Sequence, residues 1–256
     1  SVMIDYLKAT AVESRRRIQP IRIPLLCVLA SLFTVPTVTH SNDTAFNQFL
    51  FAKRLLERGE TKEATNAFDE YLASYPTDPK RGDALFYRAL IAHEAADHTA
   101  AAKFLATAPS PEFLPNYAQD LLRGQIHIHL HQYDQALTAL EKIRADPLPP
   151  KIAAFVYHLR GTAYRSSANV PAALAAFDRA SAIHSPLRAQ ALLEKARLLG
   201  QLDHHDDAIN TLRATIDLGH KSPEIPTSVI PEAALLAGQL CAQIDKNDDA
   251  IDFYRL

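Results

Sequence analysis

The sequence predicts an all-α fold, a solenoid of about six stacked helix pairs in which the last pair is incomplete. Three columns of residues that recur along the chain carry this prediction. Alanine returns at one anchor position with steps of 37, 35, 37, 35 and 42 residues, and a small residue stands twelve positions before each anchor. A large apolar residue stands four positions after each anchor. Small residues let two helices cross closely, and large ones fill the space beside the crossing.

The two small columns are the residues that we expect to pack the helices of each repeat. The anchors are Ala64, Ala101, Ala136, Ala173, Ala208 and Ala250, and the earlier small residues are Ala52, Ala89, Gly124, Gly161, Ala196 and Gly238. The large residues after the anchors are Phe68, Leu105, Leu140, Phe177, Leu212 and Tyr254.

The clearest copy spans residues 154–182 and resembles the tetratricopeptide repeat (TPR). Its first helix carries Tyr157, Gly161 and Tyr164, and its second carries the Ala-x-x-x-Phe-x-x-Ala pattern at residues 173–180. One such repeat cannot bury its own apolar face, so neighbouring repeats are required. The resemblance implies a right-handed superhelix whose first helices line a concave groove. The repeat spacing is also similar to that of bacterial envelope proteins of the Tol-Pal coordination and outer-membrane assembly lipoprotein type.

Residues 1–41 read as a signal peptide or signal anchor rather than as a repeat. Arginines at 15, 16, 17 and 22 precede an apolar run from Ile23 to Val38, which is the order found in secretory signals. The run is short for a membrane span, which needs about 20 apolar residues. We therefore predict cleavage near Ser41, with an uncleaved signal anchor as the alternative. Cys27 follows Leu26 where lipoproteins carry a small residue, so lipidation is not expected.

The solenoid is predicted over residues 45–256, with boundaries set by turn residues. The expected repeats are 45–81, 82–116, 117–153, 154–188, 189–230 and a truncated 231–256, with a linker at 219–232. Prolines 79, 111 and 186 each follow Asp or Ser, a pair suited to a helix start, and Pro150 and Pro231 could open helices likewise. Gly59 is placed to end a first helix in a left-handed conformation. Because the last copy stops at Leu256 without a polar capping helix, we expect the protein to continue.

Composition excludes some classes of partner. The chain has 27 Lys and Arg against 29 Asp and Glu; residues 1–41 hold five and two of these, which leaves 22 against 27. This mild acidity argues against nucleic acid, because phosphate binding relies on clustered Lys and Arg. After cleavage only Cys241 would remain, and its place in the repeat predicts a buried core residue.

Two groups of histidines are candidates for metal binding, but each has a simpler interpretation. His127 and His131 would share one face of a helix, while His129 would point away. Zinc would need at least one further ligand, so we interpret them as core and solvated residues. The stretch Asp203-His204-His205-Asp206-Asp207 is read as a turn whose acids favour the next helix start. No catalytic or phosphate-binding motif is present, so the sequence predicts neither an enzyme nor a cofactor.

The predicted function is binding of protein or peptide segments in the concave groove. Positions of the family's groove, carried onto this chain, are Phe49, Phe86, Leu90, Gln125, His158, Arg165 and Arg197. The two arginines would suit a partner with acidic side chains. The sequence therefore predicts an exported, non-catalytic scaffold of the bacterial periplasm or cell envelope, in contact with membrane only through its N-terminal segment. The alternative is the N-terminal recruitment arm of a larger enzyme or secretion machine. Oligomeric state is left open.

Overall fold

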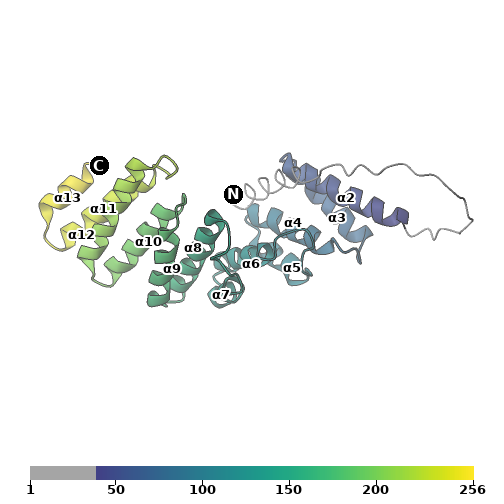
Figure 1. The fold of residues 1–256 in the computed structure, drawn as a ribbon, viewed down its shortest axis with the longest axis horizontal. Helices are drawn as coiled ribbons and strands as arrows, with labels where there is room; N and C mark the ends of the chain where they lie inside the picture. The colour runs from purple at the N-terminus through teal and green to yellow at the C-terminus, as the bar shows by residue number, and fades with distance from the viewer. Residues whose placement is uncertain (1–38) are drawn as a thin grey trace, which may run out of the picture.

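The computed structural model describes residues 39–256, which form twelve α-helices and no strand. The helices are α2 (Thr39–Glu57), α3 (Thr61–Ser74), α4 (Arg81–Glu94), α5 (His98–Ala106), α6 (Ala118–His129), α7 (Tyr133–Glu141), α8 (Pro150–Ser166), α9 (Val170–Ala182), α10 (Arg188–Gln201), α11 (His205–Lys221), α12 (Val229–Gln243) and α13 (Asn247–Tyr254). They stack in sequence order into one elongated array, with α2 and α3 toward one end and α13 at the other (Figure 1). The α-solenoid of six helix pairs is confirmed. The expected repeat boundaries stay predictions, and nearly all of the predicted signal segment lies outside the described residues.

The small and large columns of the sequence meet inside each helix pair. Gly124 on α6 faces Leu140 on α7, and Gly161 on α8 faces Phe177 on α9. A Cβ atom at these glycines would lie 2.5 Å from Leu140 Cδ2 and 2.6 Å from Phe177 Cε1. Side chains cannot approach so closely, so the helix crossings depend on the absence of a side chain at both positions.

The turn between the two helices of each pair uses one left-handed residue at the same point. These residues are Gly59, Ala96, His131, Ala168, Asp203 and Asp245, with φ between 57° and 82°. The amide of the following residue then donates to a carbonyl five positions back, as Asn169 N does to Tyr164 O at 2.9 Å. This is the pattern that commonly ends a helix, and it turns the chain into the second helix. The prediction for Gly59 is confirmed.

The predicted helix starts at three prolines are wrong. Pro79, Pro111 and Pro186 precede α4, α6 and α10, which begin at Arg81, Ala118 and Arg188. Pro150 does open α8, whereas Pro231 is the third residue of α12. The linker expected at 219–232 is also shorter, because α11 runs to Lys221 and α12 begins at Val229.

Asp78 shows why the first of these prolines lies in a turn. Its carboxylate accepts a hydrogen bond from the Tyr71 hydroxyl at 2.6 Å and from the Lys80 amide at 2.8 Å. It is thereby tied to the preceding helix α3 and does not cap α4.

A buried acid fixes the loop between α5 and α6. Asp83 on α4 is fully buried and accepts hydrogen bonds from the amides of Glu112 and Phe113 at 2.9 Å and 3.2 Å. Beside it, a Cβ at Gly82 would lie 2.8 Å from the Pro109 carbonyl oxygen. The loop therefore lies directly on the start of α4, and burial raises the pKa of the Asp83 carboxyl.

The hydrophobic core runs along the array in two clusters. One extends from α2 to α10, and the other from α10 to α13, with Ala191 of α10 in the first and Leu193 of α10 in the second. Cys241 is a free thiol within the second cluster, as expected of a core residue. None of the helices within residues 39–256 has the length and apolarity that crossing a membrane requires.

Candidate functional site

The first helices of the pairs line the inner side of the solenoid. At three of the five junctions between successive pairs the first helices pack against each other (α4 against α6, α6 against α8, and α10 against α12), whereas the second helices do so at none of the five to the same extent. Elements that approach each other across repeats lie on the tighter side of a curved array. We therefore take the surface of the first helices as the inner face.

A ladder of alternating charges crosses this inner face. It consists of Arg165 on α8, Glu194 and Arg197 on α10, and Glu232 on α12, and we refer to these four residues as the polar ladder. Arg165 pairs with Glu194, and Arg197 pairs with Glu232, while Arg197 Nη1 lies 3.8 Å from Glu194 Oε1. The Glu194 side chain is 11% exposed, against 33% for Arg165 and 37% for Arg197. Both predicted groove arginines are thus neutralised by carboxylates from the chain itself.

The sequence did not lead us to predict the two glutamates of the polar ladder as groove residues. Glu194 lies 29 residues from Arg165, and Glu232 lies 35 residues from Arg197. Both separations are close to one repeat, so a search for opposite charges about one repeat apart on first helices could have found them.

His158 and Gln125 add polar atoms that lack partners. His158 Nδ1 and Gln125 Oε1 are buried and accept or donate no hydrogen bond within the described residues. Burial lowers the pKa of His158; the Arg165 charge lowers it further, and the Glu194 carboxylate opposes the shift. Since an unpaired buried polar atom is costly, both positions could gain from a group supplied by a bound chain.

A cleft of about 500 Å³ lies between α10 and α12 at the end of the polar ladder. Its lining includes Arg197, Glu232, Leu235, Gln239 and Gln243. Leu235 is 53% exposed, so an apolar surface lies beside the charged pair. The cleft therefore offers both hydrogen-bonding groups and an apolar contact.

Three other predicted groove residues lie in the core. Phe49, Phe86 and Leu90 are each 3% exposed or less. Phe49 contacts the ring of Phe68, and its ring also lies 6.2 Å from that of Tyr87 in the next repeat. Phe49 thus links the first two helix pairs, and all three side chains are withdrawn from the protein surface. All twelve small residues assigned to repeat packing are also buried, and for them burial is what the predicted role requires.

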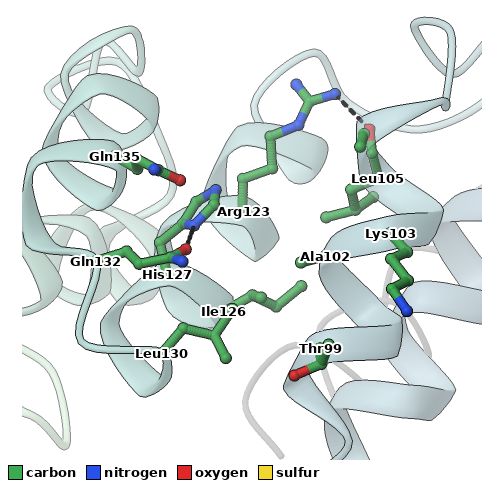
Figure 2. Close-up of a pocket in the computed structure, with 11 residues that line it drawn as sticks. Thr99, Ala102, Lys103, Leu105, Arg123, Ile126, His127, Leu130, Gln132 and Gln135 are labelled. Carbon is green, nitrogen blue, oxygen red and sulfur yellow. Dashed lines mark hydrogen bonds between the residues drawn. The ribbon is translucent and has the colours of Figure 1, made fainter.

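A second depression, of about 410 Å³, lies between α5, α6 and α7, on the side of the second helices (Figure 2). Three of its polar side chains, Arg123, His127 and Gln132, already form hydrogen bonds within the chain. Arg123 donates to the Leu105 carbonyl at 3.0 Å, and His127 shares a hydrogen bond with Gln132 at 2.8 Å. We interpret it as a gap between packed repeats.

The predicted pairing of His127 and His131 on one helix face is wrong. Helix α6 ends at His129, and His131 takes the left-handed turn conformation and hydrogen-bonds to the Tyr133 hydroxyl at 2.8 Å. It is His129 that joins other histidines: its ring contacts those of His93 on α4 and His98 on α5. We refer to His93, His98 and His129 as the histidine cluster.

The acidic and histidine turn at 203–207 contacts its own residues and the next repeat. His205 lies 3.6 Å from Asp203, and Asp206 pairs with Lys246 of the next repeat at 2.7 Å. Within residues 39–256, no group of three or more His, Cys, Asp or Glu side chains is arranged to hold a metal ion.

Two protein-family models match this chain. The family model described as "T7SS, ESX-1 secretion system protein EccA1, N-terminal domain" matches residues 8–199, and a tetratricopeptide repeat model matches residues 193–256. No curated protein matches the chain.

Solved structures with a similar fold are tetratricopeptide proteins. MamA (41-end) from Desulfovibrio magneticus RS-1 is 20% identical, with a TM-score of 0.61 over 71% of this chain and 98% of that one. PilW, a type IV pilus biogenesis factor, is 17% identical, with a TM-score of 0.62 over 82% and 90%. PilF of Pseudomonas aeruginosa is 19% identical, with a TM-score of 0.60 over 83% and 90%. At these identities the likeness shows the fold, and it confirms the TPR resemblance; the narrower likeness to Tol-Pal proteins stays a prediction.

Proposed function

We propose, on the premise that the chain belongs to the family of T7SS, ESX-1 secretion system protein EccA1 N-terminal domains, that residues 39–256 recruit a partner protein to a secretion machine. TPR proteins bind protein partners, and their fold is typically a non-catalytic scaffold. The family therefore favours the recruitment arm over the general envelope scaffold that we also considered.

The observation that carries the proposal is the inner face between α8 and α12. There the polar ladder, the unpaired Nδ1 of His158 and the cleft beside Leu235 lie on successive first helices. Because the ladder is electrically balanced, a strongly acidic partner would have to displace Glu194 or Glu232 from the arginines. A segment that offers both hydrogen-bond donors and acceptors, with one apolar side chain for the cleft, fits this surface better.

Export to the periplasm or envelope is a separate proposal that rests on the N-terminal segment. Its basic residues followed by the apolar run support export. The family match begins at residue 8 and so includes most of this segment, which supports its retention in the mature chain. Mass spectrometry of the native protein separates these alternatives: a chain that begins near residue 42 supports export with cleavage.

The recruitment proposal is tested first by cross-linking. A photoreactive p-benzoylphenylalanine in place of Gln239, which lines the cleft on α12, should capture a partner in living cells. The same residue in place of exposed Asn247, at the start of α13, is the control and should capture much less of that partner.

Binding of the captured partner is then measured with matched charge insertions. Leu235→Lys with Gln239→Lys alters the cleft, whereas Ile251→Lys with Asn247→Lys alters exposed residues of α13 by the same charge. Hot-spot losses of about 2 kcal/mol or more are expected for the cleft pair only. Equal weakening by both pairs, at unchanged helicity, would exclude the inner face as the binding surface.

A further inference from the structure

The histidine cluster joins the second and third helix pairs. His93 lies in the last turn of α4, His98 is the first residue of α5, and His129 is the last residue of α6. The rings of His98 and His129 stack with centroids 4.4 Å apart and planes 13° apart. His93 Nδ1 lies 3.1 Å from His98 Nδ1, and its ring centroid lies 5.3 Å from that of His129. His98 therefore contacts one histidine within its own pair and one from the next pair.

The contact between the Nδ1 atoms of His93 and His98 can hold one proton between them. A neutral imidazole has one nitrogen that donates and one that accepts, whereas a protonated ring donates from both. At 3.1 Å, one Nδ1 must donate to the other. If both rings were protonated, two N–H groups would face each other and the contact would be lost.

The stack of His98 on His129 meets a similar limit. Two positively charged rings 4.4 Å apart, face to face, repel each other. Each of the three rings contacts the other two, so protonation of any two of them places positive charge on rings that touch. The cluster is thus stable as packed only while at most one of its three rings is positively charged.

Few charges near the cluster offset this repulsion. Glu94 follows His93 on α4 and favours its protonated form, while His131, just beyond α6, disfavours protonation of His129. Asp97, in the turn before His98, uses its carboxylate to accept the Ala100 amide at 2.9 Å. Burial and the neighbouring histidines lower the pKa of His93 to about 4, and they lower that of His129 as well.

We propose that the histidine cluster makes the joint between the second and third helix pairs acid-sensitive, so that protonation separates α5 from α6 and reorients the first two pairs relative to the rest. The depression between α5 and α6, which reaches Thr99 and Leu130 beside the cluster, shows that the packing of this joint is already incomplete (Figure 2). This inference is independent of the proposed function, because it concerns the shape of the array and involves none of the polar-ladder residues.

The test measures one distance across the joint. Nitroxide labels at Glu70→Cys on α3 and Thr138→Cys on α7, both exposed positions, are introduced with Cys27→Ser and Cys241→Ala to remove the native thiols. Pulsed electron paramagnetic resonance at pH 7.5 and at pH 5.0 gives the distance distribution. We expect one population at pH 7.5 and a second, displaced population at pH 5.0, because histidines released from the packed joint regain the ordinary pKa of about 6.5 and take up protons at that pH.

Two variants decide whether the histidine cluster is the cause. His129→Gln removes the stacked ring and should abolish the displaced population, while His127→Gln, on the same helix but outside the cluster, should retain it. Circular dichroism at both pH values establishes that each variant is folded. An unchanged distribution in the parent protein, or a displaced population that persists in His129→Gln, overturns the proposal.

Discussion

Gly161 faces the ring of Phe177 so closely that a Cβ atom on residue 161 would lie 2.6 Å from Phe177 Cε1. These residues belong to two of the columns that recur through the sequence, and the structure brings them together where α8 crosses α9. The same relationship joins Gly124 to Leu140 and Gly238 to Tyr254. The spacing of the repeat thus follows from the need to place one large side chain against one missing side chain.

Gly161→Leu should destabilise the protein by about 1–3 kcal/mol, because a large side chain forced into a packed crossing displaces Phe177. Urea unfolding monitored by circular dichroism measures the change. Ala175→Leu, at an exposed position of α9, adds the same side chain without a crossing and should leave stability nearly unchanged. Equal losses in both variants would contradict the assigned contact.

Ala168→Gly should stabilise the protein by about 0.5–1 kcal/mol. Ala168 is exposed and has a φ of 60°, a left-handed conformation that costs an L-residue roughly 1–2 kcal/mol, part of which glycine's greater entropy loss offsets. The thermal midpoint should therefore rise. Ala175→Gly, at an exposed helical position, should lower it instead, because glycine weakens a helix by about 1 kcal/mol. A lower midpoint in both variants would be inconsistent with the left-handed turn.

Arg165→Met should cost about 1–3 kcal/mol, because it leaves the nearly buried Glu194 carboxylate with weaker partners. The comparison is Arg213→Met, which removes an arginine whose ion pair with Asp249 is half exposed at both side chains. Such surface pairs contribute at most about 1 kcal/mol. Denaturant midpoints of the two variants should differ accordingly, and a smaller loss for Arg165→Met than for Arg213→Met would argue against the polar ladder as a structural element.

Stability should decrease as the pH falls below about 6.5, the usual pKa of histidine. The pKa values of His93, His129 and His158 are lowered in the folded chain, so the unfolded chain binds more protons in this range. Their contribution is fully present above the unfolded pKa and is lost on acidification. His158→Leu should reduce the difference in unfolding free energy between pH 7.5 and pH 5.5, whereas His220→Gln, at an exposed site, should not. A pH dependence that is the same in His158→Leu as in the parent would exclude His158 as a contributor.

The fold could be predicted from the sequence because the repeat pattern is local. The alanine at 173 and a large residue at 177 have counterparts at the same spacing in every copy, and helix crossings impose that spacing regardless of what surrounds a pair. The helix starts at the prolines were predicted wrongly because they depend on contacts with other parts of the chain. A proline suited to a helix start also suits the turn before it, and Asp78 accepts a hydrogen bond from Tyr71 of the preceding helix.

The inner face was harder to predict because it depends on how one repeat sits against the next. Phe86 and Arg197 both map to groove positions, yet Phe86 is fully buried and the Arg197 side chain remains 37% exposed. Glu194 and His98 each gain a main partner from about one repeat away, Arg165 and His129. No pattern within a single repeat contains that information.

Helix α10 contributes side chains to both core clusters, with Ala191 in one and Leu193 in the other. In a linear array, cooperativity passes only between neighbours, so a helix shared by two cores determines whether they unfold together or separately. A substitution that weakens only one side of α10 would uncouple the array into two independently melting blocks. Calorimetric transitions of this protein should therefore split at α10 sooner than at any other helix.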